Sequence, residues 1–159
     1  MRSCRPRRFA GLLAAVLVTS AATGCDDPVA PEVTDLARAM DRWEARGPRD
    51  YSFDYQVSCF CPLPEVQPLR IEVRDSEVVR ALPAGSDEGL DDKALDEIPT
   101  IDDLFEWILD AIDGEADRID ATYDDRLGYP HDVYIDRIKQ AIDDELSFEV
   151  SNFQALSLR

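Results

Sequence analysis

Hydrophobic and polar residues alternate along residues 51–61, and this period of two predicts a half-buried strand. Polar residues occupy positions 52, 54, 56 and 58, and the other face carries Tyr51, Phe53, Tyr55, Val57, Cys59 and Cys61. Shorter alternating runs predict further strands at 69–73, 78–82, 119–123, 133–135 and 146–150. A change of parity at 151–152 predicts a bulge that turns Phe153 inward.

Helical periodicity marks two other segments, 32–46 and 101–113. Apolar residues recur in both at three or four positions, and Thr100 is a good N-cap for the second. Gly47 and Gly114 follow the last periodic residues, where helices commonly end. The resulting order, α-β-β-β-α-β-β-β, predicts an α+β fold with an antiparallel sheet of about six strands and two main helices on one face.

The turn at residues 75–76 leaves the register of the third strand open. A two-residue loop would place Arg80 on the core face, whereas a three-residue loop with a bulge would turn Val79 and Ala81 inward. We expect the second arrangement because it keeps the arginine in solvent. Residues 83–98 read as a long loop with one helical turn near its end.

The first 24 residues have a cationic head and a short apolar stretch, which are features of an export signal. The apolar stretch is too short for a permanent membrane span. Ala22-Thr23-Gly24-Cys25 resembles the bacterial lipobox, so we expect residues 1–24 to be a signal peptide and Cys25 to be lipidated. Residues 25–32 would form a lipidated tether and residues 33–159 a single domain. A soluble secreted protein cut nearby is the alternative.

These N-terminal features predict where the protein is located in the cell. The protein is expected to be exported and lipid-anchored to a bacterial membrane, with its domain facing the periplasm or the cell exterior. The inner and the outer membrane both stay open as its location.

The net charge of the chain limits which classes of molecule it can bind. The 159 residues carry 17 Lys and Arg against 34 Asp and Glu, a net charge of −17. Removal of residues 1–24, with four arginines and no acid, makes the charge more negative still. Such a field repels nucleic acids and anionic headgroups and favours cations or a basic partner.

Cysteine usage follows from the proposed export. Cys4 would leave with the signal and Cys25 would carry lipid, which leaves Cys59 and Cys61 in an oxidising compartment. We expect a disulfide between them, although so short a loop contributes only about 1.5 kcal/mol. Two reduced buried thiols and a redox or metal role are the alternatives.

Acidic clusters in the second half suggest a calcium site, although the EF-hand spacing is absent. No cofactor is expected, and Ca²⁺ is the alternative. The candidate ligands are Asp124, Asp125, Asp136, Asp143, Asp144 and Glu145.

No catalytic motif is present, since the sequence has neither G-x-S-x-G nor H-E-x-x-H. The lone histidine, His131, reads as a surface loop residue rather than a general base. We therefore expect no enzyme activity, and a hydrolase with paired carboxylates or a thiol-redox protein remains as an alternative.

Three segments together resemble a family of small bacterial lipoproteins known only as a domain of unknown function. They are Cys59-Phe60-Cys61-Pro62 after Tyr51, the run T-I-D-D-L-F at 100–105, and the segment from Tyr123-Asp124 through Gly128-Tyr129-Pro130. The resemblance implies export, a single domain and the α+β outline, and it brings no activity or catalytic residues. We therefore expect a membrane-anchored lipoprotein that serves as a binding or structural module of the cell envelope, with another envelope protein as its partner. A calcium-dependent envelope module is the alternative.

Overall fold

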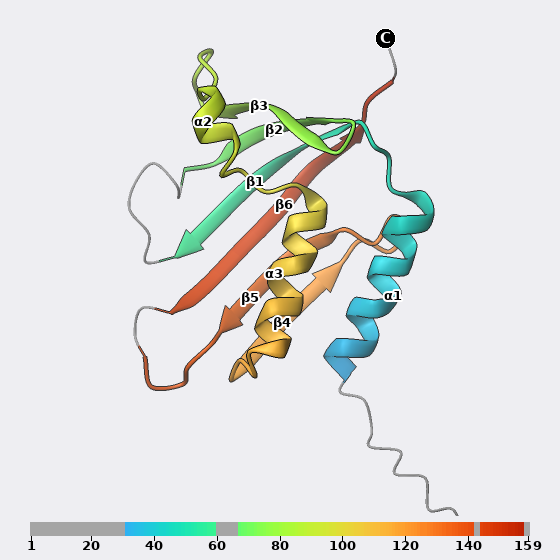
Figure 1. Cartoon of the computed structure of the whole chain (residues 1–159), viewed down its shortest axis with the longest axis vertical. Helices are drawn as coiled ribbons and strands as arrows, with labels where there is room; N and C mark the ends of the chain where they lie inside the picture. Colours follow the sequence, from blue (N-terminus) through green and yellow to red (C-terminus); the bar gives the residue numbers. More distant parts are fainter. Residues whose placement is uncertain (1–30, 60–66, 142–143, 158–159) are drawn as a thin grey trace, which may run out of the picture.

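An antiparallel sheet of six strands, covered on one face by helices, forms the architecture of the protein (Figure 1). The computed structural model describes residues 31–59, 67–141 and 144–157. In chain order the elements are α1 (Pro31–Arg46), β1 (Tyr51–Cys59), β2 (Leu69–Arg74), β3 (Glu77–Pro83), α2 (Asp92–Leu95), α3 (Ile101–Asp113), β4 (Arg118–Tyr123), β5 (Pro130–Asp136) and β6 (Glu145–Ala155). The predicted α+β fold and its order are confirmed, and the single helical turn expected near residue 94 is α2.

The strands lie in the order β3-β2-β1-β6-β5-β4, so β1 and β6 meet at the centre of the sheet. Their pairing extends from Tyr51 opposite Ala155 to Cys59 opposite Leu146. β3 and β4 form the two edges. The described helices include none that is long and apolar enough to cross a membrane.

α3 is the best-defined helix because local interactions fix its start and an apolar face fixes its packing. The Thr100 hydroxyl accepts from the Asp103 amide at 3.2 Å, and the Asp103 carboxylate accepts from the Thr100 amide at 2.8 Å. The predicted N-cap is therefore confirmed. At the other end Gly114 follows the helix as expected, but Glu115, with φ of 53°, takes the left-handed conformation that terminates it.

The inward face of β1 forms the centre of the core, as its alternation predicts. Tyr51, Phe53, Tyr55 and Val57 are all buried. The Tyr51 hydroxyl accepts a hydrogen bond of 3.1 Å from the Ile101 amide, which ties the strand to the start of α3. β1 thus organises both the sheet and the helix above it.

The β2–β3 hairpin differs from the expected register. Asp75 and Ser76 both have positive φ, at 49° and 68°, and form a two-residue turn whose twist suits a hairpin. A register shift further along β3 lets Val78 and Ala81 both pair with inward-facing residues of β2. The inward placement of Ala81 is confirmed. That of Val79 is wrong: Val79 is 48% exposed, because the bulge follows a tight turn instead of widening it.

The predicted bulge in β6 is confirmed, and polar side chains on the uncovered face of the sheet hold it. Asn152 has φ of 49°, and the pairing with β1 shifts register there. Its amide donates to the Asp54 carboxylate at 2.6 Å. Phe153 turns inward and stacks on Tyr129, with ring centroids 4.6 Å apart.

The loop between β4 and β5 docks closely on α1. Asp124 shapes this loop, since its Oδ1 accepts from the amides of Arg126 and Leu127. Gly128 has φ of 93°, and a Cβ there would lie only 2.2 Å from the Ala39 carbonyl oxygen of α1. Only glycine fits this contact, which attaches the first helix to the far edge of the sheet.

Candidate functional site

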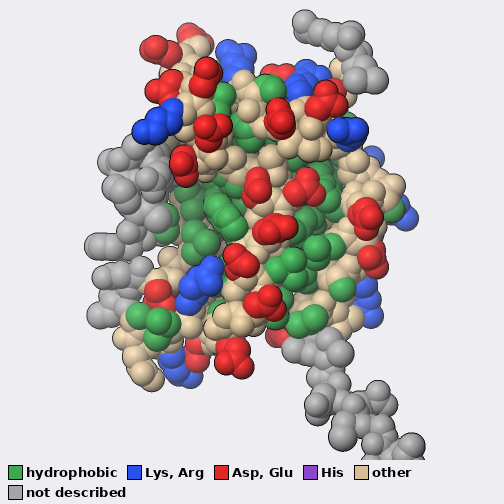
Figure 2. All heavy atoms as spheres, viewed as in Figure 1, with side chains coloured by type: hydrophobic (Ala, Val, Ile, Leu, Met, Phe, Trp, Pro, Cys, Tyr) green, Lys and Arg blue, Asp and Glu red, His purple; other side chains and the backbone are tan. Residues whose placement is uncertain are grey.

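A cavity of about 740 Å³ opens on the helix-covered side of the sheet, and we call it the helix-side cavity. It lies where α2 and the middle of α3 approach the ends of β1, β2 and β6. Figure 2 shows the surface on this side, with hydrophobic side chains gathered in a hollow beside a row of acidic side chains. Its apolar lining is Tyr55, Val57, Cys59, Leu69, Leu90, Ala94, Ile98, Pro99, Trp107 and Leu146.

The chain between β3 and α3 builds one wall of this cavity. The Leu90 amide donates to the Ala81 carbonyl at 2.9 Å, which folds the loop back against β3. The Asp91 carboxylate then caps α2 by accepting from the Ala94 amide at 2.9 Å. These two anchors place Leu90 and Ala94 at the cavity.

Trp107 forms the opposite wall. It lies beside the buried stripe of α3 and is only partly buried. Its ring packs edge-on against Phe148 of β6, with centroids 6.1 Å apart. The indole is thereby fixed in the cavity wall.

Tyr55 brings the one hydroxyl among the described residues of the lining. The residue is only 4% exposed and its ring lies 6.3 Å from that of Phe148. Within the described part of the chain its hydroxyl has no hydrogen-bond partner. Burial raises the pKa of Tyr55 well above its usual value, so the hydroxyl stays protonated at neutral pH.

Charged side chains surround the mouth of the cavity. Glu97, Asp110 and Arg137 line it together with Gln67. Asp110 belongs to an acidic row on the outer side of α3, visible in Figure 2. The exposed members of that row are Asp102, Asp103, Glu106, Asp110 and Asp113.

The predicted cysteine site borders the same cavity. Cys59 is partly buried at the end of β1 and is disulfide-bonded. Cys61, its predicted partner, and Cys25, the predicted lipidation site, lie outside the described residues. The pairing and the lipidation therefore stay predictions.

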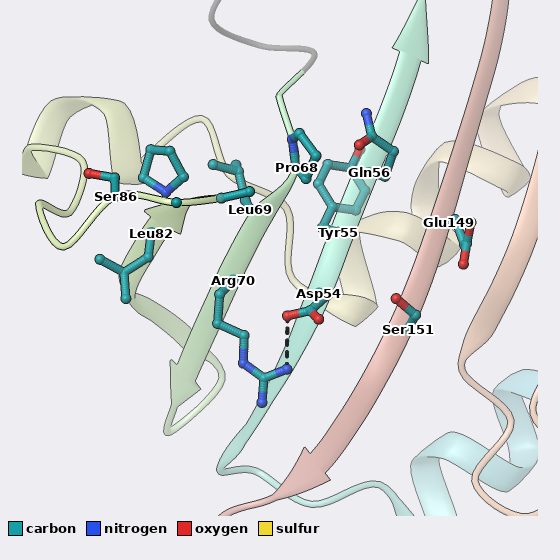
Figure 3. Close-up of a pocket in the computed structure, with 13 residues that line it drawn as sticks. Asp54, Tyr55, Gln56, Pro68, Leu69, Arg70, Leu82, Ser86, Glu149 and Ser151 are labelled. Carbon is teal, nitrogen blue, oxygen red and sulfur yellow. Dashed lines mark hydrogen bonds and ion pairs between the residues drawn. The ribbon is translucent and has the colours of Figure 1, made fainter.

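A second pocket, of about 560 Å³, lies on the uncovered face of the sheet (Figure 3). The Arg70 guanidinium dominates it and donates to the Asp54 carboxylate at 2.9 Å and to the Ser52 hydroxyl at 2.9 Å. It also donates to the Asn152 carbonyl at 3.0 Å. Because these groups satisfy one another, the cluster stabilises the β6 bulge rather than presenting free charges to a ligand.

The described members of the predicted calcium set divide between the two ends of β5, and Asp144 lies at the second end, next to Glu145 at the start of β6. Asp124 and Asp125 lie in the loop before β5, whereas Asp136 and Glu145 pair with each other at the far end of that strand. Asp143 lies outside the described residues. In the parts of the chain that the structure describes, no three His, Cys, Asp or Glu residues form a group able to hold a metal ion.

His131 is exposed, as expected. It belongs to β5 rather than to a loop, because that strand begins at Pro130, three residues earlier than the hydrophobic alternation indicates. The pairing of Pro130 with Tyr123 explains this longer strand.

The helix-side cavity was not predicted from the sequence. Two signals point to its surroundings: Trp107 lies off the apolar stripe of α3, and residues 83–98 form an unusually long connection. Neither signal shows that the two meet in space, since this depends on how the loop folds back on β3.

The fold and the site define a class of small α+β domains, in which helices cover one face of an antiparallel sheet and leave an apolar cavity beneath them. The chain belongs to a family of unknown function (DUF6174), which it matches over residues 35–155. Comparisons with curated proteins and with solved structures gave no match. The predicted membership of a domain family of unknown function is thus confirmed.

Proposed function

We propose that the protein is a lipid-anchored domain of the bacterial cell envelope that binds a ligand in the helix-side cavity rather than catalysing a reaction. The observation that carries the binding role is the largely apolar lining of this cavity, to which Tyr55 adds a hydroxyl that has no partner among the described residues. Ligand sites of this size are commonly apolar with a few well-placed polar groups. Both acids of the described lining, Glu97 and Asp110, are exposed residues, whereas paired carboxylates with a defined geometry would be needed for hydrolysis.

The lipobox-like sequence at 22–25 supports the anchor. Six peptide steps separate Cys25 from Pro31, the first residue of α1, and they span at most roughly 20 Å. A diacylglyceryl group on Cys25 would therefore hold the domain close to the bilayer. The strong negative charge would keep its surface from adhering to anionic headgroups.

The anchor is tested with the full chain expressed in a bacterial host. We expect the processed protein to begin at residue 25, to carry a lipid mass, and to partition into the detergent phase. The matched control, Cys25→Ser expressed without residues 1–24, should lack the lipid mass and partition into water. Wild-type protein that partitions into water would refute the anchor.

The same preparations test the disulfide by intact mass with and without reductant under denaturing conditions. We expect Cys59 and Cys61 to pair with each other, so the non-reduced protein should show no free thiol. Two free thiols in the exported protein, or a mixed disulfide with another chain, would contradict this pairing.

A structural role with an envelope protein as partner is the second candidate. It is favoured by the face of the sheet that no described helix covers (Figure 1), where Asp54, Glu149 and Ser151 give a polar surface. A photo-crosslinking residue at Ser147, on that face, should capture a partner, whereas one at Glu106 on the helix side should not. Equal capture from both positions would argue against a specific interface.

A further inference from the structure

The apolar lining of the helix-side cavity and the Tyr55 hydroxyl indicate what kind of ligand the cavity takes. We propose that the cavity binds a compact neutral amphiphile, whose apolar body fills the space between Trp107 and Leu69 and whose single carbonyl or hydroxyl group pairs with Tyr55. This inference rests on the binding role proposed above and names the class of ligand.

The apolar body follows from the lining. Val57 and Leu69 come from neighbouring strands, Leu90 and Ile98 from the connection before α3, and Leu146 from β6. A volume of about 740 Å³ suits a ligand of drug size. Among the described lining residues only Glu97, Asp110 and Arg137 are charged, and all three are exposed, so most of the described wall favours apolar surface.

The single polar group follows from Tyr55. The Tyr55 hydroxyl has no partner among the described residues and is not fully buried, so a ligand group that reaches it from the cavity can form a hydrogen bond with it. The residue is 4% exposed and lines the cavity, so a group that reaches its hydroxyl must itself enter the cavity. A tyrosine hydroxyl can donate to a carbonyl or accept from a hydroxyl, and both chemistries fit.

The neutral charge follows from the mouth. The charged residues that line the cavity are the two acids Glu97 and Asp110 and the single base Arg137, and Asp110 belongs to the acidic row of α3. A carboxylate ligand would meet net repulsion on entry, and its charge would have to leave water to reach Tyr55. An ammonium group is favoured at the mouth but carries the same desolvation cost inside.

The test uses the mature chain, residues 25–159, with Cys25→Ser, which carries neither the signal nor the lipid and needs no detergent, and the neutral fluorescent probe N-phenyl-1-naphthylamine. We expect saturable binding of one probe per chain and displacement by 1-decanol. Decanoate and decylamine should compete at least tenfold less well. Stronger competition by either charged compound than by decanol would overturn the neutral class.

Two variants locate the binding. Tyr55→Phe should weaken decanol binding about fivefold, the effect of one lost hydrogen bond. Its matched control, Tyr134→Phe on the other face of the sheet, should leave binding unchanged. Undiminished decanol binding by Tyr55→Phe would refute the role of the hydroxyl. Because that hydroxyl has no partner in the described structure, the Phe variant should keep its fold, which circular dichroism checks.

Ala94→Trp separates this inference from the proposed function. The larger side chain should fill the cavity and abolish probe binding. If Ala94→Trp binds the probe as the parent does, or if the parent does not bind it, the binding role of the cavity fails. If Ala94→Trp loses binding but Tyr55→Phe does not, the cavity binds and only the proposed ligand class fails.

Discussion

The indole Nε1 of Trp43 donates a hydrogen bond of 2.9 Å to the carboxylate of Asp102 and so links the last turns of α1 to the first turn of α3. Trp43 is 7% exposed and packs edge-on against Tyr51 at 5.4 Å. The hydroxyl of that tyrosine in turn accepts from Ile101. Tyr51 of the central strand thus contacts both helices: its ring packs on Trp43 of α1, and its hydroxyl bonds the first residue of α3.

We expect Trp43→Phe to destabilise the fold by about 2–3 kcal/mol, because it removes a hydrogen bond to a charged group and leaves space beside Tyr51. Urea unfolding measures the change. Glu106→Gln, on the exposed side of α3, is the control and should stay within about 0.5 kcal/mol of the parent. A Phe variant as stable as this control would mean that the link is not stabilising.

Gly128→Ala should be strongly destabilising, by about 3 kcal/mol or more, because the new Cβ would collide with the α1 backbone at Ala39. Gly85→Ala is a matched control. Gly85 also has positive φ, at 79°, but no atom lies within 4 Å of the position that a Cβ would take there. Gly85→Ala should lose only the roughly 1–2 kcal/mol of stability that the left-handed backbone conformation costs a residue with a Cβ. Equal losses in urea unfolding would show that close approach contributes nothing.

The bulge in β6 should depend on the side chain of Asn152. Asn152→Ala loses the bond to Asp54 and keeps the strained φ, so we expect a cost of about 2 kcal/mol. Asn152→Gly loses the bond but relieves the strain, and should cost about half as much. If the glycine variant proves less stable than the alanine variant, backbone strain is not the controlling factor.

Stability should fall at alkaline pH. Burial raises the pKa of Tyr51 and Tyr55 in the folded protein, and burial with the nearby Asp35 carboxylate raises the pKa of Tyr123 to about 12. Below pH 10 these tyrosines are protonated in both states and contribute no pH dependence. Above pH 10 the unfolded chain releases their protons first, so unfolding becomes more favourable as pH rises.

Each tyrosine that is ionised in the unfolded chain but protonated in the folded protein lowers the free energy of unfolding by about 1.4 kcal/mol per pH unit. Tyr55→Phe should therefore reduce the loss of stability between about pH 10.5 and 12, which urea unfolding at a series of pH values measures. An unchanged slope would mean that Tyr55 ionises as easily in the folded protein as in the unfolded chain.

The strands and α3 could be predicted because their patterns are local. The period of two around Phe53 and the capping residue Thr100 identify which face is buried and where the helix begins, without knowledge of the rest of the fold. The bulge near Asn152 was equally visible, as a change of parity. These predictions agree with the structure.

The register of β3 and the helix-side cavity could not be predicted, for different reasons. The turn at Asp75 uses positive φ without the Asn-Gly or Asp-Gly signal that usually marks it, so its length was misjudged. The cavity requires Tyr55, Ala94 and Trp107 to meet, and no local pattern relates residues from a strand, a short helix and a long one. The arrangement of the predicted calcium ligands could not be read from the sequence either, because the two ends of β5 separate Asp124 and Asp125 from Asp136 and Glu145.

The insertion of β6 between β1 and β5 also governs the order in which the molecule can assemble. A chain emerges from a ribosome or an export channel with its N-terminal part first, so β1 must wait for the last strand before both of its sides are paired. Until then the β1–β2–β3 meander and the β4–β5 hairpin remain two separate half-sheets. Such long-range pairing makes folding slow. The sheet therefore cannot close until the last strand has left the ribosome or the channel.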